Sequence, residues 1–173
     1  MDKELAKQIK NNKQIWRDML ERDGFPKRKD KAIEEFDELT VELELERLNP
    51  LMSDKRKINM VDELADSSLM VESIIEIFKI TPKMLKQFKY DQEITLLDAL
   101  ETLSGEIELS DSLDFVSDEL LQAIVQVSYG INQYIEKYAI KSNIFFRRMF
   151  KIEKVKNLAY GIITSHGTAF MND

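Results

Sequence analysis

Cysteine is absent from the 173 residues, and glycine and proline are scarce, with 5 and 3 copies. The absence of cysteine excludes disulfides, thiolate metal sites and thiol nucleophiles. Because turn-forming residues are few and long stretches are rich in Leu, Ile, Glu and Lys, the composition favours long helices over short strands. The sequence therefore predicts an all-α fold, a helical bundle built as one domain over residues 1–173.

Histidine is limited to one residue, and phosphate-binding glycine loops are absent. The only histidine, His166, stands alone, which excludes a histidine-based metal site and a serine triad. It also excludes the paired Glu-x-x-His motifs of di-iron bundles. No glycine-rich loop of the P-loop or dinucleotide-binding type is present. These exclusions leave the acidic residues as the main candidates for chemistry.

Positive charge is in short supply. The chain has 25 basic against 32 acidic residues, a formal net charge of −7. This balance argues against a nucleic-acid partner, because such binding depends on neutralising phosphates, whereas a small anionic ligand can still bind where a metal bridges it. The first residues lack the apolar core of a signal peptide, and no apolar run is long enough to cross a bilayer. No membrane association and a cytoplasmic location are therefore expected.

Hydrophobic periodicity and capping residues predict a series of helices. Gly24-Phe25-Pro26 should end the first, and Asp30 is the expected N-cap of the second, which Asn49-Pro50 ends. Ser53 or Asp54 should begin the third, and Thr81-Pro82 the fourth. The last helix is basic, and the residues after it are expected to be loose. The predicted helices cover residues 2–22, 30–48, 54–79, 82–89, 93–109, 115–139 and 141–162.

Two segments resemble each other. Residues 31–45 and 58–76 form one pair of helical stretches, within a motif-bearing hairpin at 27–80, and residues 94–109 and 114–132 form another, within 93–140. Aligning the pairs matches Glu35 with Asp98, Glu38 with Glu101, Glu63 with Glu119 and Asp66 with Gln122. The second pair is interpreted as a degenerate internal duplication. Its acidic residues are either remnants of a second metal site or a structural relic, and the relic is favoured because Gln122 lacks the charge of Asp66. Shared helical periodicity is the alternative explanation.

Two acidic pairs in the first hairpin carry the candidate chemistry. Glu35 and Glu38 are three residues apart, as are Glu63 and Asp66, so each pair lies on one helical face. If the two helices pack antiparallel, the four carboxylates converge. Without a partner they would repel one another, whereas a magnesium ion turns the same cluster into a favourable site. A magnesium site is therefore predicted, and it suits phosphoryl chemistry.

An ordinary solvated helix face is the competing interpretation, since so acidic a chain produces this spacing by chance. The context favours the metal site. Both pairs lie on predicted amphipathic helices, and the 63 − 38 − 1 = 24 residues between them contain one helix end and one helix start, as in a helical hairpin. The neighbouring Glu34, Glu42 and Asp62 are interpreted as surface charge or support.

The strings KAIEEFDELTVEL and NMVDELADSSLMVESI resemble the signature of the MazG-like nucleoside triphosphate pyrophosphohydrolases, EExxE followed by ExxD. The resemblance covers residues 31 to about 78. It implies that Glu35, Glu38, Glu63 and Asp66 hold Mg²⁺, for which Mn²⁺ can substitute. It also implies a homodimer that hydrolyses a (deoxy)nucleoside triphosphate to the monophosphate and pyrophosphate in nucleotide-pool housecleaning. Glu38 is the candidate catalytic base, although the sequence leaves the choice among the carboxylates open.

The tandem arrangement is similar to the dimeric dUTPase and dCTPase branch of that superfamily. The chain lacks the tryptophans of that branch, since its only tryptophan is Trp16. Lys141, Asn143, Arg147 and Arg148 loosely resemble its phosphate-contacting stretch, and an amphipathic helix with snorkelling charges is the alternative. Two other functions stay open: a catalytically silent nucleotide-binding or protein-interaction module, and a purely structural bundle.

Overall fold

The computed structural model describes residues 3–160, which form seven helices and no strand. The predicted all-α helical bundle is therefore confirmed for this range. His166, the expected tail and the last two residues of the predicted helix 141–162 lie outside the described residues. The helices are α1 (Lys3–Asp23), α2 (Phe25–Leu48), α3 (Asp54–Ile77), α4 (Pro82–Leu85), α5 (Leu96–Leu109), α6 (Asp118–Lys137) and α7 (Lys141–Tyr160).

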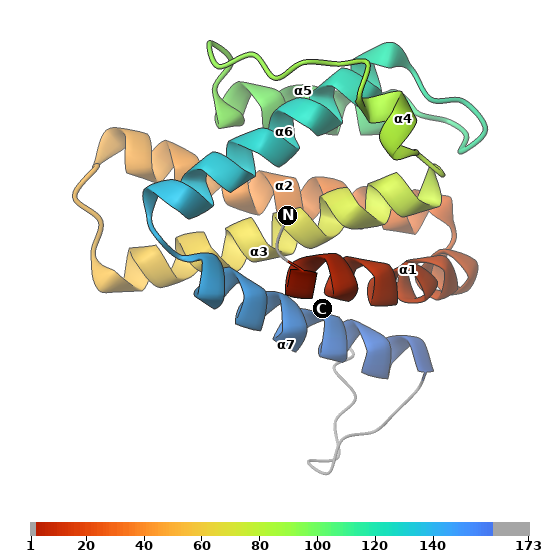
Figure 1. Cartoon of the computed structure of the whole chain (residues 1–173), viewed down its shortest axis with the longest axis horizontal. Coiled ribbons are helices and arrows are strands. Elements are labelled where there is room, and N and C mark those ends of the chain that lie inside the picture. Colours follow the sequence, from red (N-terminus) through yellow and green to blue (C-terminus); the bar gives the residue numbers. More distant parts are fainter. Residues whose placement is uncertain (1–2, 161–173) are drawn as a thin grey trace.

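The helices form three layers (Figure 1). The α2–α3 hairpin is the middle layer. The α5–α6 hairpin packs on one side of it, α5 mainly against α2, and α1 and α7 pack on the other side, chiefly against α3. The middle hairpin is thus covered on both sides, whereas within the described residues the outer surface of α5–α6 carries only the short helix α4 and the loops around it.

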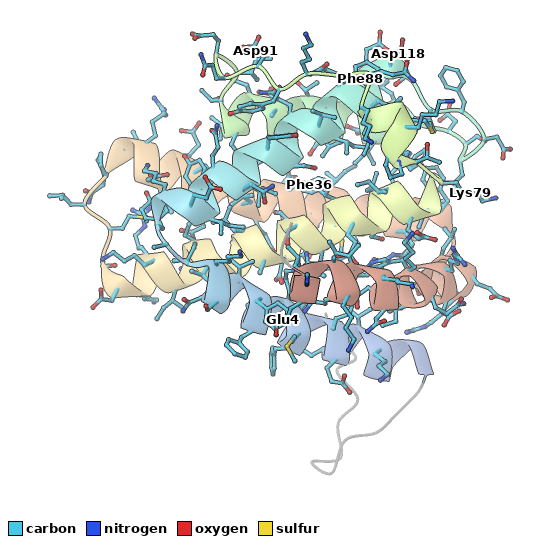
Figure 2. All side chains as sticks on the ribbon, viewed as in Figure 1. Glu4, Phe36, Lys79, Phe88, Asp91 and Asp118 are labelled. Atoms are coloured by element: carbon cyan, nitrogen blue, oxygen red, sulfur yellow. The ribbon has the colours of Figure 1, made fainter. Side chains whose placement is uncertain are left out.

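The core lies between these layers. Trp16, Phe36, Leu64, Leu100 and Ile124 are fully buried, one from each of α1, α2, α3, α5 and α6. Figure 2 shows Phe36 in the middle of the molecule. Because each of these helices places large apolar side chains on the side that faces its neighbours, burial of those sides is the main force holding the layers together.

The predicted break between the first two helices, over residues 23–29, is too long, because only Gly24 separates α1 from α2. Asp30 is not an N-cap, because α2 already begins at Phe25 and Asp30 lies inside it. Gly24 alone makes the turn, with a φ of 80° that favours glycine. Pro26 is tolerated because its missing N–H falls in the first turn, where no carbonyl is available to pair with it.

Hydroxyl side chains begin four helices. The predicted caps Ser53 and Thr81 accept hydrogen bonds from the backbone N–H groups of Arg56 and Met84. Thr95 and Ser117 do the same for α5 and α6, so these helices start later than the predicted residues 93 and 115. The α4 helix covers only Pro82–Leu85, shorter than the predicted 82–89.

Left-handed residues follow α3 and α6, which end at residues 77 and 137, earlier than the predicted 79 and 139. Lys79, with a φ of 55°, follows α3, and Ala139, with a φ of 50°, follows α6. In each case paired backbone hydrogen bonds close the helix end: Ile80 N–H to the Ile75 carbonyl, and Ile140 N–H to the Ile135 carbonyl. Among residues 3–160, no helix is both long and apolar enough to span a membrane.

Candidate metal centre

Three acidic side chains from two helices meet at the middle of the bundle. Glu35 of α2 and Glu63 and Asp66 of α3 each offer a carboxylate oxygen, and these oxygens lie within 4.8 Å of one another. The antiparallel packing of α2 on α3 sets this register, and the Ser67 hydroxyl reinforces it by donating to the Glu35 carbonyl oxygen at 3.2 Å. Within residues 3–160 this is the only such group that could hold a metal ion.

Glu38, the fourth expected ligand and the candidate base, lies outside that group of three. Its side chain is exposed one turn after Glu35, at the wall of a groove of about 500 Å³ between α2 and the end of α5. Burial, and then the nearby Glu35 carboxylate, raises the pKa of Glu38. The groove is lined by Asp30, Ile33, Glu34, Asp37, Glu38, Val41 and Glu108.

Each of the three converging carboxylates has one oxygen without a partner. Glu35 and Asp66 are only 1% and 4% exposed. Glu35 Oε2, Glu63 Oε2 and Asp66 Oδ1 are buried and accept no hydrogen bond. A buried polar atom without a partner is costly, and native proteins satisfy nearly all of them. A cation would satisfy these oxygens, and carboxylate oxygens are the ligands that Mg²⁺ and Mn²⁺ prefer.

Two lysines hold the remaining oxygens of the group. Lys31 Nζ lies 2.8 Å from Glu35 Oε1. Lys151 Nζ, from α7, lies 3.0 Å from Asp66 Oδ2 and 3.7 Å from Glu35 Oε1. Sequence reasoning missed both. Lys31 stands four residues before Glu35 on one helix, a spacing that signals such a pair, but only the tertiary packing brings α7 to α3.

The electrostatics of the group favour a bound cation. Burial raises the pKa of Glu63 to about 8, and the negative charges of Glu38 and Asp66 add to this effect. Burial also raises the pKa of Asp66, against the opposing charge of Lys151. Burial disfavours the charged form of Lys151, but Asp66 and Glu35 outweigh it and raise the pKa of this lysine. In the metal-free state Glu63 therefore keeps a proton near neutral pH, which a cation would replace.

The four basic-segment residues proposed to contact phosphate are not brought together. Lys141 and Asn143 are exposed in the first turn of α7. The Arg147 guanidinium is paired with Asp62 at 3.2 Å, beside the acidic group on α3. Of the four, Arg147 is the one that the structure places next to the predicted metal ligands.

Arg148 belongs to a buried network where α7 packs against α1 and α3. Its side chain is 3% exposed and donates to Gln8 at 2.8 Å, to Ser68 at 2.7 Å and to Glu72. Glu72 also accepts a hydrogen bond from the Trp16 indole at 2.9 Å. These bonds use the guanidinium to fasten α7 to α1 and α3, so Arg148 is not available to a ligand.

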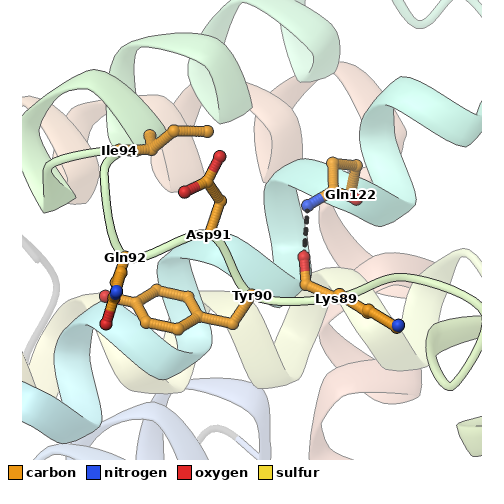
Figure 3. A pocket seen from close by; sticks show the side chains of 6 residues that line it. All are labelled: Lys89, Tyr90, Asp91, Gln92, Ile94 and Gln122. Atoms are coloured by element: carbon orange, nitrogen blue, oxygen red, sulfur yellow. Dashed lines mark hydrogen bonds between the residues drawn. The ribbon is translucent and has the colours of Figure 1, made fainter.

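The counterpart positions in the second hairpin form no comparable group. Asp98, Glu101 and Glu119 are exposed on α5 and α6. Gln122, at the position of Asp66, donates to the Lys89 carbonyl at 3.0 Å and lines an open hollow of about 580 Å³ (Figure 3). Figure 3 shows this amide turned toward the loop that crosses α6, where it fixes backbone.

Comparisons of the chain with models of protein families, with curated proteins and with solved structures gave no significant match. The centre is therefore characterised by its own geometry: three converging carboxylates, each with one buried oxygen that has no partner, two lysines paired with them and an open groove beside them.

Proposed function

We propose that the chain hydrolyses a (deoxy)nucleoside triphosphate to the monophosphate and pyrophosphate, with Mg²⁺ as cofactor and Mn²⁺ as a substitute. One observation carries the proposal. Glu35, Glu63 and Asp66 converge from two helices, and each presents a buried oxygen that has no partner. An all-oxygen set of this kind fits a hard divalent cation, and such a cation in a protein commonly binds substrate phosphates.

Glu38 is the proposed general base of the reaction. Its carboxylate lies at the groove beside Glu35, and its partial burial, followed by the charge of Glu35, raises its pKa. A raised pKa makes a carboxylate a better general base near neutral pH. A bound ion supplies neutralisation of the triphosphate charge. The attacking water forms a bond to the α-phosphorus and gives its proton to Glu38, while the bond from the α-phosphorus to the bridging oxygen breaks and pyrophosphate leaves.

The outer end of the first hairpin supports a homodimer. Val41, Leu45, Leu48, Leu51 and Ile58 are between 40% and 89% exposed, all near the end of α2 or the start of α3. Exposed apolar side chains gathered in one place mark interaction surfaces. A second copy of the chain is the proposed occupant, and light scattering on the full chain, native against Leu48→Asp, tests it. A monomeric native chain would contradict it.

Pyrophosphate release tests the proposed reaction. The native protein is offered a panel of canonical, deoxy and modified nucleoside triphosphates with Mg²⁺, beside Asp66→Asn and the matched control Asp98→Asn. We expect turnover that stops with EDTA and in Asp66→Asn, and that persists in Asp98→Asn because Asp98 is exposed and outside the acidic group. Turnover that survives EDTA or Asp66→Asn would contradict the proposal.

A catalytically silent nucleotide-binding module is the second candidate, favoured by the position of Glu38 outside the group of three. It predicts Mg²⁺-dependent nucleotide binding without pyrophosphate release. Melting temperature separates both candidates from a purely structural bundle, because a ligand that binds only the folded state raises it. Neither Mg²⁺ nor nucleotide would shift the melting of a structural bundle.

A further inference from the structure

We infer that the centre takes a single divalent cation, and that Lys31 and Lys151 are positioning residues that occupy the oxygens a second cation would need. The inference rests on the proposed metal centre and adds its stoichiometry. It is carried by one observation: in both Glu35 and Asp66, one carboxylate oxygen contacts a lysine and the other has no partner.

Each of these two carboxylates gives one oxygen to a lysine and keeps the other. In Glu35, Oε1 contacts Lys31 at 2.8 Å and Lys151 at 3.7 Å, whereas Oε2 has no partner. In Asp66, Oδ2 accepts from Lys151 at 3.0 Å, whereas Oδ1 has no partner. Glu63 Oε2 also has no partner. Each of the three carboxylates brings one oxygen within 4.8 Å of the others. A second cation would have to displace the lysines.

The charge balance agrees with one ion. Glu35, Glu63 and Asp66, together with the neighbouring exposed Glu38, bring four negative charges when ionised, and Lys31 and Lys151 bring two positive ones, so 4 − 2 = 2 negative charges remain. One divalent cation neutralises these charges. A second would leave an excess of positive charge among largely buried groups, which is expensive in a medium that screens weakly.

Both lysines are built into the packing. Their side chains are only 23% and 14% exposed. Lys31 is fixed on α2 four residues before Glu35, and Lys151 is on α7 three residues after Arg148, whose buried bonds to Glu72 and Ser68 fasten that helix to α3. The two ammonium groups are therefore held beside the carboxylates of Glu35 and Asp66.

Counting bound Mn²⁺ on the full chain without nucleotide tests the inference, by calorimetric titration and by the loss of the free-ion electron paramagnetic resonance signal. We expect one ion per native chain. Lys31→Met/Lys151→Met frees Glu35 Oε1 and Asp66 Oδ2, and the count should rise to two. Lys31→Met/Lys151→Arg retains a cation beside Asp66 and should return the count to one. Lys137→Met, which removes a lysine from Glu46 elsewhere in the bundle, should leave it at one.

Two ions or none on the native chain, or one ion on the folded double variant, would overturn the inference. If circular dichroism shows that this double variant does not fold, Lys31→Ala/Lys151→Ala decides, because it frees the same two oxygens: two ions support the inference and one overturns it. Hydrolysis is measured separately. One ion without turnover would refute the hydrolase and keep the stoichiometry, and two ions with turnover would do the reverse.

Discussion

The α2–α3 and α5–α6 hairpins share a pattern of helices and acidic residues, yet the corresponding residues differ in burial and in the groups that they contact. In α2–α3, Glu35 and Asp66 are buried and face each other. In α5–α6, their counterparts Asp98 and Gln122 are exposed or bound to backbone. The cause lies in the layers: α1 and α7 cover α3, whereas no long helix among residues 3–160 covers the outer side of α5–α6 (Figure 1).

This difference shows that acidic spacing alone does not make a metal centre. A carboxylate that faces water is solvated and has no need of a cation, whereas a carboxylate covered by another helix needs a positive partner. In the first hairpin that cover is α7, which brings Lys151 to Asp66 and Arg147 to Asp62. Four changes test this contrast, in order of decreasing expected effect.

Removing the buried arginine that holds α7 against α3 should have the largest effect on stability. Arg148→Met leaves Glu72 as a buried charge without its cation, which should lower the free energy of unfolding by about 3 to 5 kcal/mol. Arg147→Met loses a partly exposed pair with Asp62 and should cost less than about 1 kcal/mol. Urea denaturation measures both values. Equal losses of unfolding free energy in the two variants would show that the buried network around Arg148 does not hold α7 against α3.

Removing one acidic side chain should weaken Mn²⁺ binding in the first hairpin and leave it unchanged in the second. Glu35→Gln takes away a buried oxygen of the acidic group and should weaken Mn²⁺ binding about a hundredfold, about 2.7 kcal/mol. Asp98→Asn changes the matching position of the second hairpin, which is exposed, and should leave the affinity unchanged. Isothermal titration calorimetry measures both. A similar loss in Asp98→Asn would mean that the second hairpin binds the ion too.

Stability without metal should fall as pH rises through the range of Glu63. Its pKa in the folded chain is about 8, above its ordinary 4.5, so the folded state holds a proton that the unfolded state has released. The free energy of unfolding should therefore decrease between about pH 4.5 and 8, by about 1 to 2 kcal/mol because solvent screens this half-buried group. Denaturation in EDTA at several pH values measures the slope.

Glu63→Gln should reduce that slope, and Glu119→Gln, at the exposed counterpart, should keep it. Excess Mn²⁺ should also flatten it, since the ion replaces the proton. An unchanged slope in Glu63→Gln would show that burial of this carboxyl does not govern the pH dependence.

Glu46 should respond to pH with the opposite sign, and with the smallest effect. It lies at the far end of α2 and joins the two hairpins, because it accepts from Lys137 at 2.8 Å and from the Tyr138 hydroxyl. Burial opposes its charge, but these bonds outweigh it and lower the pKa of Glu46. Its contribution is therefore present above about pH 4.5 and is lost as the pH falls through the lowered pKa.

Glu46→Gln should cost about 1 kcal/mol at pH 7, and the difference from the native chain should shrink in acid. The conservative Glu44→Gln, on the exposed side of the same helix, provides the control. A difference that grows in acid would contradict the assigned sign.

Local chemistry made most of the fold predictable from the sequence. Asn49-Pro50, Ser53 and Thr81-Pro82 act on their immediate neighbours, and the structure has the corresponding helix ends and starts there. The start of α2 was missed because Gly24 makes the whole turn alone and Pro26 fits a first helical turn. The spacing of Glu63 and Asp66 on one helix, and the antiparallel return to Glu35, likewise follow from the chain itself.

Only the tertiary structure decided which acidic residues became a centre. Glu38 and Glu35 have the same local signal, but Glu35 turns toward α3 and is buried, whereas Glu38 faces the groove. Lys151 and Arg148 come from a helix more than 70 residues away in sequence, and no local pattern indicates that one meets Asp66 and the other Glu72. Sequence periodicity fixes the face of a helix, whereas the partner of that face is set by the packing of all the layers at once.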